Sequence, residues 1–115
     1  MIMIKRIYET PEPSDGYRVF VDRLWPRGLK REMAAIDHWA KAITPSTELR
    51  TWYDHRPERW DEFQLRYRLE LATGKAVDEL ARLRAAAKSG PMTLLTATRN
   101  EAQNHAMVAR DVLGS

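Results

Sequence analysis

A short apolar run behind a turn most strongly constrains the fold of this chain. In "YRVFVD", Val19, Phe20 and Val21 are consecutive instead of alternating with polar residues, which is typical of a strand covered on both faces. A second apolar run, "MTLLTA", follows near the end of the chain, and residues 1–8 predict a further strand. Helical segments between these strands require crossover connections, and therefore predict a mainly parallel sheet.

The helical segments are recognised by their periodicity and their end signals. The clearest is residues 57–72, in which Trp60, Phe63 and Tyr67 fall on one stripe. Further helices are predicted for residues 29–35, 47–53, 75–88 and 101–113, and Asn100 with Gln103 resembles a capping box for the last of these. Residues 36–43, "IDHWAKAI", favour a strand, with a helix as the close alternative.

Length and composition agree with one small domain. We expect residues 1–115 to form a single α/β domain, with a sheet of about four strands flanked by helices. The chain has no cysteine, which excludes disulfides, a thiol nucleophile and a cysteine zinc site. No apolar run approaches the roughly 20 residues that a membrane helix needs, so we expect a cytoplasmic protein with no membrane partner.

Several common chemistries have no motif in this sequence. There is no P-loop, no G-x-G-x-x-G and no nucleophile elbow. His38, His55 and His105 lack the spacing of metal ligands. We therefore predict neither a metal site nor a cofactor, and no standard dinucleotide or nucleoside triphosphate enzyme.

The loop "DRLWPRG", from Asp22 to Gly28, follows the second strand and is rich in binding groups. Arg23 and Arg27 offer forked donors suited to phosphate or carboxylate, and Trp25 offers a flat face for a ring. Ligands of parallel sheets bind at the carboxyl ends of strands, which is where this loop is expected. The alternative is structural: Asp22 pairs with one of these arginines and Trp25 belongs to the core.

The segment "TATRNEAQNHA" offers a second candidate site at the start of the last predicted helix. His105 borders the inward stripe one turn into that helix, and its ring is expected to point toward the end of the "MTLLTA" strand. A histidine there suits proton transfer or a hydrogen bond to a ligand, with Arg99 and Asn104 beside it. The alternative is a buried histidine that bonds to a backbone carbonyl.

Three stretches carry a family resemblance over nearly the whole chain. "GYRVFVDRLWPRGL", "ITPSTELRTWYDHRPERWDEFQLRY" and "GPMTLLTATRNEAQNHA" resemble the domain of unknown function 488 family, in its short YeaO-like branch. The resemblance implies site positions more than an activity. It marks Asp22, Arg23, Trp25, Pro26, Arg27, Gly28, Pro45, Ser46, Leu49, Arg50, Arg99, Asn104 and His105. Longer relatives carry cysteines at the positions of Thr96 and Asn104, so their thiol chemistry cannot operate here.

The leading hypothesis is a domain that binds an anionic, phosphate-bearing small molecule or a nucleotide between the two loops. In this hypothesis Arg23, Arg27 and Arg99 neutralise charge. Trp25 and Tyr53 pack against a ring, while Asp22 and Asn104 line the site and His105 exchanges a proton.

Two alternatives come from other functional classes. The net charge of +3 resides in residues 1–31, which suits a nucleic-acid-binding accessory protein. A non-catalytic interaction module would instead use Trp52 and Trp60 as a partner surface. The sequence leaves open the ligand, the oligomeric state and whether the protein is an enzyme.

Overall fold

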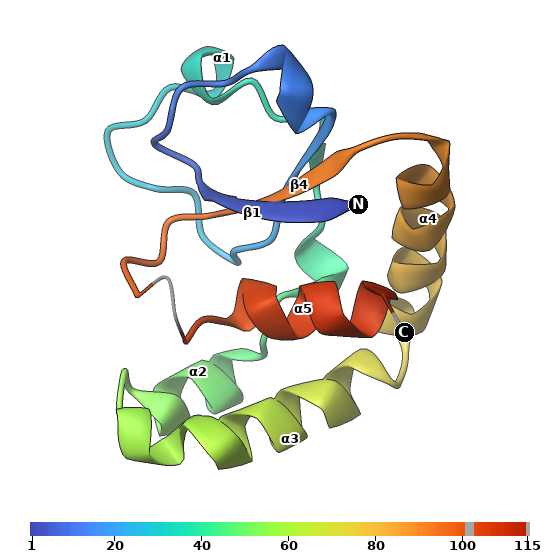
Figure 1. The fold of residues 1–115 in the computed structure, drawn as a ribbon. Helices are drawn as coiled ribbons and strands as arrows, with labels where there is room; N and C mark the ends of the chain where they lie inside the picture. The colour runs from blue at the N-terminus through green and yellow to red at the C-terminus, as the bar shows by residue number, and fades with distance from the viewer. Residues whose placement is uncertain (101–102, 115) are drawn as a thin grey trace.

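Four parallel strands form the centre of the fold (Figure 1). The structure, a computed structural model, describes residues 1–100 and 103–114. The strands are β1 (Ile2–Arg6), β2 (Tyr17–Phe20), β3 (His38–Trp39) and β4 (Met92–Thr96), in the spatial order β1-β4-β2-β3. All pairs are parallel, as the helical segments between the strands predict. β4 is the last strand in the chain but lies between β1 and β2.

Within the described residues, five α-helices and three short 3-10 helices connect and cover these strands. They are α1 (Arg31–Ala34), α2 (Thr47–Tyr53), α3 (Trp60–Leu71), α4 (Lys75–Ser89), α5 (His105–Gly114), η1 (Pro13–Asp15), η2 (Lys41–Ile43) and η3 (Pro57–Arg59). The segment 36–43 is a strand only at His38–Trp39 and then turns into η2, so neither of its two predicted structures spans it. None of the helices that the structure describes is long and apolar enough to cross a membrane.

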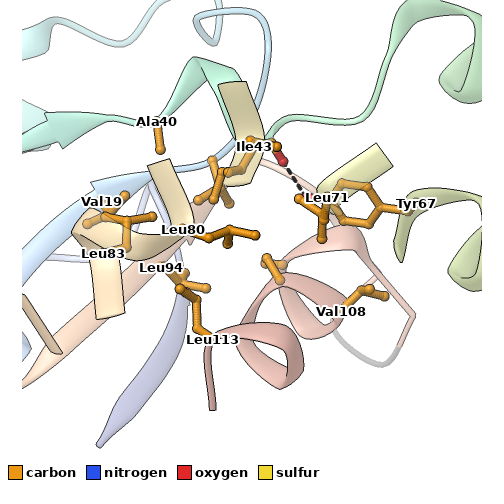
Figure 2. Packing of buried hydrophobic residues seen from close by; sticks show 14 of the residues in the cluster. Val19, Ala40, Ile43, Tyr67, Leu71, Leu80, Leu83, Leu94, Val108 and Leu113 are labelled. Atoms are coloured by element: carbon orange, nitrogen blue, oxygen red, sulfur yellow. Dashed lines mark hydrogen bonds between the residues drawn. The ribbon is translucent and has the colours of Figure 1, made fainter. Parts of the chain in front are cut away.

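The main core lies between one face of the sheet and helices α4 and α5, with α3 packed on these two helices. Val19 of β2 and Leu94 of β4 pack there against Tyr67 of α3, Leu80 of α4 and Val108 of α5 (Figure 2). All five side chains are buried, and the Tyr67 hydroxyl donates a hydrogen bond to the carbonyl of Ile43. The stripe predicted for α3 therefore faces this core.

A smaller core covers the opposite face of the sheet. Phe20 and Leu95, the neighbours of Val19 and Leu94, point to this side and are fully buried. The covering groups come from α1 and from the loop after β2, with Trp25 and Trp39 packed against the cluster. Both faces of the central strands are therefore covered, which explains why β2 and β4 carry continuous apolar runs.

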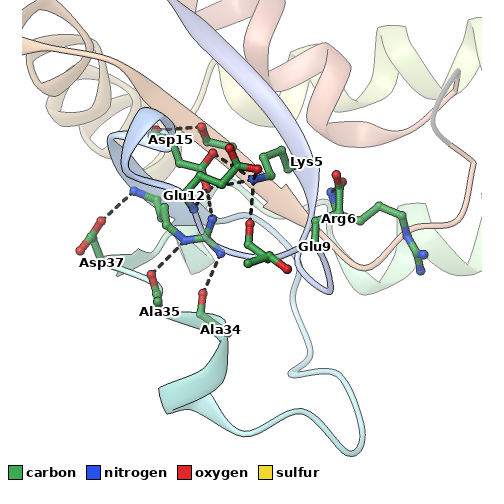
Figure 3. Close-up of polar contacts among 11 residues, drawn as sticks. Lys5, Arg6, Glu9, Glu12, Asp15, Ala34, Ala35 and Asp37 are labelled. Atoms are coloured by element: carbon green, nitrogen blue, oxygen red, sulfur yellow. Dashed lines mark hydrogen bonds and ion pairs between the residues drawn. The ribbon is translucent and has the colours of Figure 1, made fainter.

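Buried charges tie η1 to α1 on this second face. The Arg18 guanidinium pairs with Asp15 and donates to the carbonyls of Ala35 at 3.0 Å and Ala34 at 2.7 Å. Lys5 Nζ lies 3.0 Å from Asp15 Oδ1, as the polar contacts in Figure 3 show. Asp15 and Arg18 are both buried, so the charges compensate one another away from water.

A close approach of two backbone segments requires glycine at position 16. Gly16 has a φ of +66°, and a Cβ there would lie 2.1 Å from the carbonyl oxygen of Pro91. The next residue, Tyr17, donates its backbone N–H to that same oxygen at 2.9 Å. The turn before β2 is therefore packed directly on the residue before β4.

Candidate functional site

The carboxyl ends of β2 and β4 are joined by the side chain of Asp22. Asp22 follows β2, and its Oδ1 accepts a hydrogen bond from the Thr96 hydroxyl at 2.7 Å. Its Oδ2 accepts the backbone N–H of Ala97 at 2.8 Å. Because β2 and β4 are parallel neighbours, the two loops predicted to carry binding groups meet at this edge of the sheet.

His105 completes this junction from the first residue of α5. Its Nε2 lies 3.0 Å from Asp22 Oδ1 and 3.0 Å from the carbonyl oxygen of Val21. Both neighbours are acceptors, so the network assigns the proton to Nε2. Nδ1 has no hydrogen-bond partner within residues 1–100 and 103–114 and is the ring atom left for a ligand.

The start of α5 differs from the sequence expectation. Asn100 Oδ1 does accept the backbone N–H of Gln103 at 3.0 Å, but the helix begins only at His105. Asn104 precedes the helix, where its Oδ1 accepts the N–H of Met107 at 3.3 Å. His105 is therefore the first helical residue instead of lying one turn inside, and its ring contacts the end of β2. Residues 101 and 102, the start of the predicted helix, lie outside the described part of the chain.

The Asp22 carboxylate is held in its ionised form. Burial alone would raise its pKa, but the hydrogen bond and the charge of His105 lower it, and the donors of Ala97 and Thr96 lower it further, so that the pKa of Asp22 lies below its usual value. Its oxygens are engaged by these donors.

A cleft of about 630 Å³ opens between these strand ends and the α2–α3 layer. One wall is aromatic: Tyr53 at the end of α2 packs against Phe63 with ring centroids 4.7 Å apart, and Trp60 stacks on Phe63 at 5.5 Å. The chain turns between α2 and η3 through two left-handed residues, Asp54 and His55, which also line the cleft. A flat group entering the cleft would meet this aromatic wall.

Three arginines line the cleft from three different segments. They are Arg23 after β2, Arg50 in α2 and Arg99 after β4. Arg23 Nε donates to the carbonyl of Pro45 at 3.3 Å. In the described part of the chain, none of the three guanidinium groups pairs with a carboxylate. These three groups are therefore free of ion pairs within the described residues, in a lining that also contains Asp22 and Asp54.

The structure divides the predicted site residues into two groups. The first group lines the cleft and consists of Asp22, Arg23, Tyr53, Arg99, Asn104 and His105. Trp25 and Arg27 are not in that lining. Trp25 packs edge-on against Phe20 on the opposite face of the sheet, and its Nε1 donates to the carbonyl of Leu29 at 2.7 Å. Arg27 is exposed in the same loop, so Arg23, Arg27 and His105 do not converge.

Three residues that line the cleft are not predicted as site residues from their local sequence pattern. Trp60 and Phe63 lie on the predicted inward stripe of α3, and in the structure they also form the aromatic wall of the cleft. Arg50 was marked only by the family resemblance. Its spacing of one helical turn from Tyr53 is the signal that places both on the cleft side of α2.

Comparison with known proteins places this chain in a family. A family model described as "Inactive DUF488-N3 subclade" matches residues 1–115. The chain belongs to this DUF488-N3 subclade. This DUF488-N3 protein is 47% identical over 114 residues to the uncharacterized protein YeaO of Escherichia coli K12, covering 99% of this chain and 97% of YeaO. It is 43% identical over 112 residues to the uncharacterized protein Rv3073c of Mycobacterium tuberculosis, covering 97% and 92%. No solved structure gives a significant match.

Proposed function

We propose that the cleft binds a small anionic molecule that carries a planar ring, with a nucleotide or another phosphate-bearing metabolite as the expected class. The observation that carries this proposal is the convergence of Arg23, Arg50 and Arg99, without carboxylate partners in the described chain, on a cleft with an aromatic wall. Its volume of about 630 Å³ lies within the range of roughly 300–1,000 Å³ for small-molecule sites.

The two sides of the cleft suit the two parts of such a ligand. Guanidinium groups bind phosphate or carboxylate through paired N–H donors. Tyr53 and Trp60 offer ring faces and edges to a base or another aromatic group. His105 also lines the cleft, and its Nδ1 would form a hydrogen bond with the bound molecule.

The description of the family as inactive favours binding over turnover. The chain contains no cysteine, and the Asp22 carboxylate is occupied by three neighbouring groups. We therefore give His105 a binding role. Chemical conversion of a bound ligand by the native protein, lost in His105→Gln, would instead assign it the acid–base role.

An interaction surface around Trp52 and Trp60 has less support. Trp52 is covered by two cations, with the Arg66 and Arg59 guanidinium carbons 4.3 Å and 5.2 Å from its ring centroid. Trp60 is packed on Phe63. Neither ring is among the exposed large apolar side chains, so neither offers a free apolar surface.

A ligand screen with matched variants tests the proposal. Thermal unfolding would be followed with nucleotides and phosphate-bearing metabolites, because a ligand at one hundred times its Kd stabilises the fold by about 2.7 kcal/mol. We expect Arg50→Ala and Arg99→Ala to lose this response and Arg68→Ala, a control on the exposed Arg68–Asp111 pair, to keep it. No stabilising ligand, or an equal response in all variants, would contradict the proposal.

A further inference from the structure

A second group of cations lies on the face of the sheet that α1 covers, outside the lining of the cleft. The Arg31 guanidinium carbon lies 5.1 Å from the ring centroid of Trp25 and 5.0 Å from that of Trp39. Lys41 Nζ lies 4.2 Å from the centroid of Trp39. Two positive charges are therefore held over one pair of packed indoles, whose centroids are 5.6 Å apart.

Two more cations stand in the loop beside these indoles. Arg27 and Lys30 are exposed in the segment that leads from Trp25 into α1. We call Arg27, Lys30, Arg31 and Lys41, with the two indoles beneath, the tryptophan ridge. The acidic side chains between Trp25 and Lys41 are Glu32 and Asp37. The Asp37 carboxylate accepts the backbone N–H of Arg18 at 2.8 Å.

The ridge cations differ from three basic side chains on the helices. Arg66, Arg68 and Arg82 each form an ion pair with a carboxylate, of Glu62, Asp111 and Glu79 respectively. None of the four ridge cations has such a partner in the part of the chain that the structure describes. Their charge is therefore available to an anion from outside the molecule.

The number of these groups, and the different segments that carry them, indicate the kind of anion. Four cations spread over a loop, a helix and a 3-10 turn match a chain of phosphates better than a single one. When the Arg31 and Lys41 side chains turn toward phosphates, the indole faces beneath them can stack with unpaired bases. A carboxylate-rich peptide would use the charges but not the ring faces.

We propose that the tryptophan ridge binds the backbone of single-stranded nucleic acid. This inference is independent of the ligand in the cleft, although the two surfaces touch: Trp39 Nε1 donates to the backbone carbonyl of Asp22 at 2.7 Å. A strand on the ridge would therefore pass close to the entrance of the cleft, beside Arg23.

Fluorescence anisotropy with a labelled oligothymidylate in increasing KCl tests the proposal. Each phosphate contact to a single strand contributes about −0.7 to the slope of log K against log salt, so four ridge contacts predict a slope of about −3. The double variant Arg27→Ala with Lys30→Ala should reduce the slope by about 1.4. The control, Arg68→Ala with Lys88→Ala, removes the same two residue types elsewhere and should leave the slope unchanged.

Three results would overturn the proposal. One is no binding at low salt, and another is an equal loss in the ridge and control variants. The third is that the ridge variant keeps oligothymidylate binding but loses binding to polyglutamate or to phosphatidylserine vesicles. The vesicle arm is included because Leu24 and Met33, next to the ridge in sequence, are 66% and 69% exposed. Arg50→Ala should leave oligothymidylate binding intact, which separates the ridge from the cleft.

Discussion

Asp22 Oδ1 lies 3.0 Å from His105 Nε2, so the residue that follows β2 is tied to the residue that begins α5. The same carboxylate also accepts hydrogen bonds from Thr96 and Ala97 at the end of β4. One side chain therefore holds two strands and a helix together at the floor of the cleft. It also engages Nε2 of His105 and leaves Nδ1 without a partner in the described chain.

The pH dependence of stability should reveal this role. The folded-state pKa of Asp22 lies below its unfolded value of about 3.9. Its stabilising effect is therefore present above that value and is lost as the pH falls through the folded pKa. We expect Asp22→Asn to lower the free energy of unfolding by about 1–3 kcal/mol at pH 7, and by less at pH 3.

Urea unfolding at both pH values measures this difference. Asp111→Asn, in an exposed ion pair with Arg68, is the control and should change stability by less than about 1 kcal/mol. An equal effect of Asp22→Asn at pH 7 and pH 3 would show that the charge of Asp22 does not stabilise the fold.

Replacing Gly16 should be far more harmful than replacing another glycine of similar conformation. Gly16 and Gly74 have φ values of +66° and +60°, but a Cβ at Gly74 meets nothing within 4 Å. Gly74→Ala should cost about 1–3 kcal/mol for the backbone conformation alone. Gly16→Ala adds the clash with Pro91, for a further 1–3 kcal/mol or so. Equal melting temperatures of the two variants would rule out this close approach.

The buried Arg18–Asp15 pair should be sensitive to loss of one partner. Arg18→Met leaves the Asp15 carboxylate with Lys5 as its remaining cation and leaves the carbonyls of Ala34 and Ala35 without the guanidinium donors. We expect a loss of about 3–5 kcal/mol in urea unfolding at pH 7. Arg66→Met breaks the exposed pair with Glu62 and should cost less than about 1 kcal/mol. Similar losses in both variants would contradict a structural role for the buried charges.

The sequence predicts those elements whose side chains repeat with a clear period or form a continuous apolar run. β2, β4 and α3 have such patterns, and each is found where the pattern indicates. The segment 36–43 does not, because a strand of two residues followed by a 3-10 turn is too short for either period to develop. The start of α5 was misplaced because two asparagines compete for the capping position, and Asn104 precedes the helix.

Some features of the candidate site follow from the predicted topology, whereas others depend on tertiary contacts that no local pattern predicts. Asp22 and His105 are brought together by topology, since parallel neighbours place their following loops at one edge. The position of Trp25 depends instead on the loop folding back onto Phe20, which no local pattern encodes. Trp60 shows a further ambiguity, because one apolar stripe on a helix serves both as core and as the wall of a cleft.

The place of β4 in the sheet determines when the cleft can form during folding. Ile2 is paired with Met92 and Tyr17 with the same residue, so β4 separates the first two strands although it comes last in the chain. Closing such long segments costs chain entropy before any pairing compensates for it, which favours late and cooperative assembly of the sheet. Asp22 and Thr96 become neighbours only when this last strand inserts. A chain arrested before that step has no site to offer a ligand.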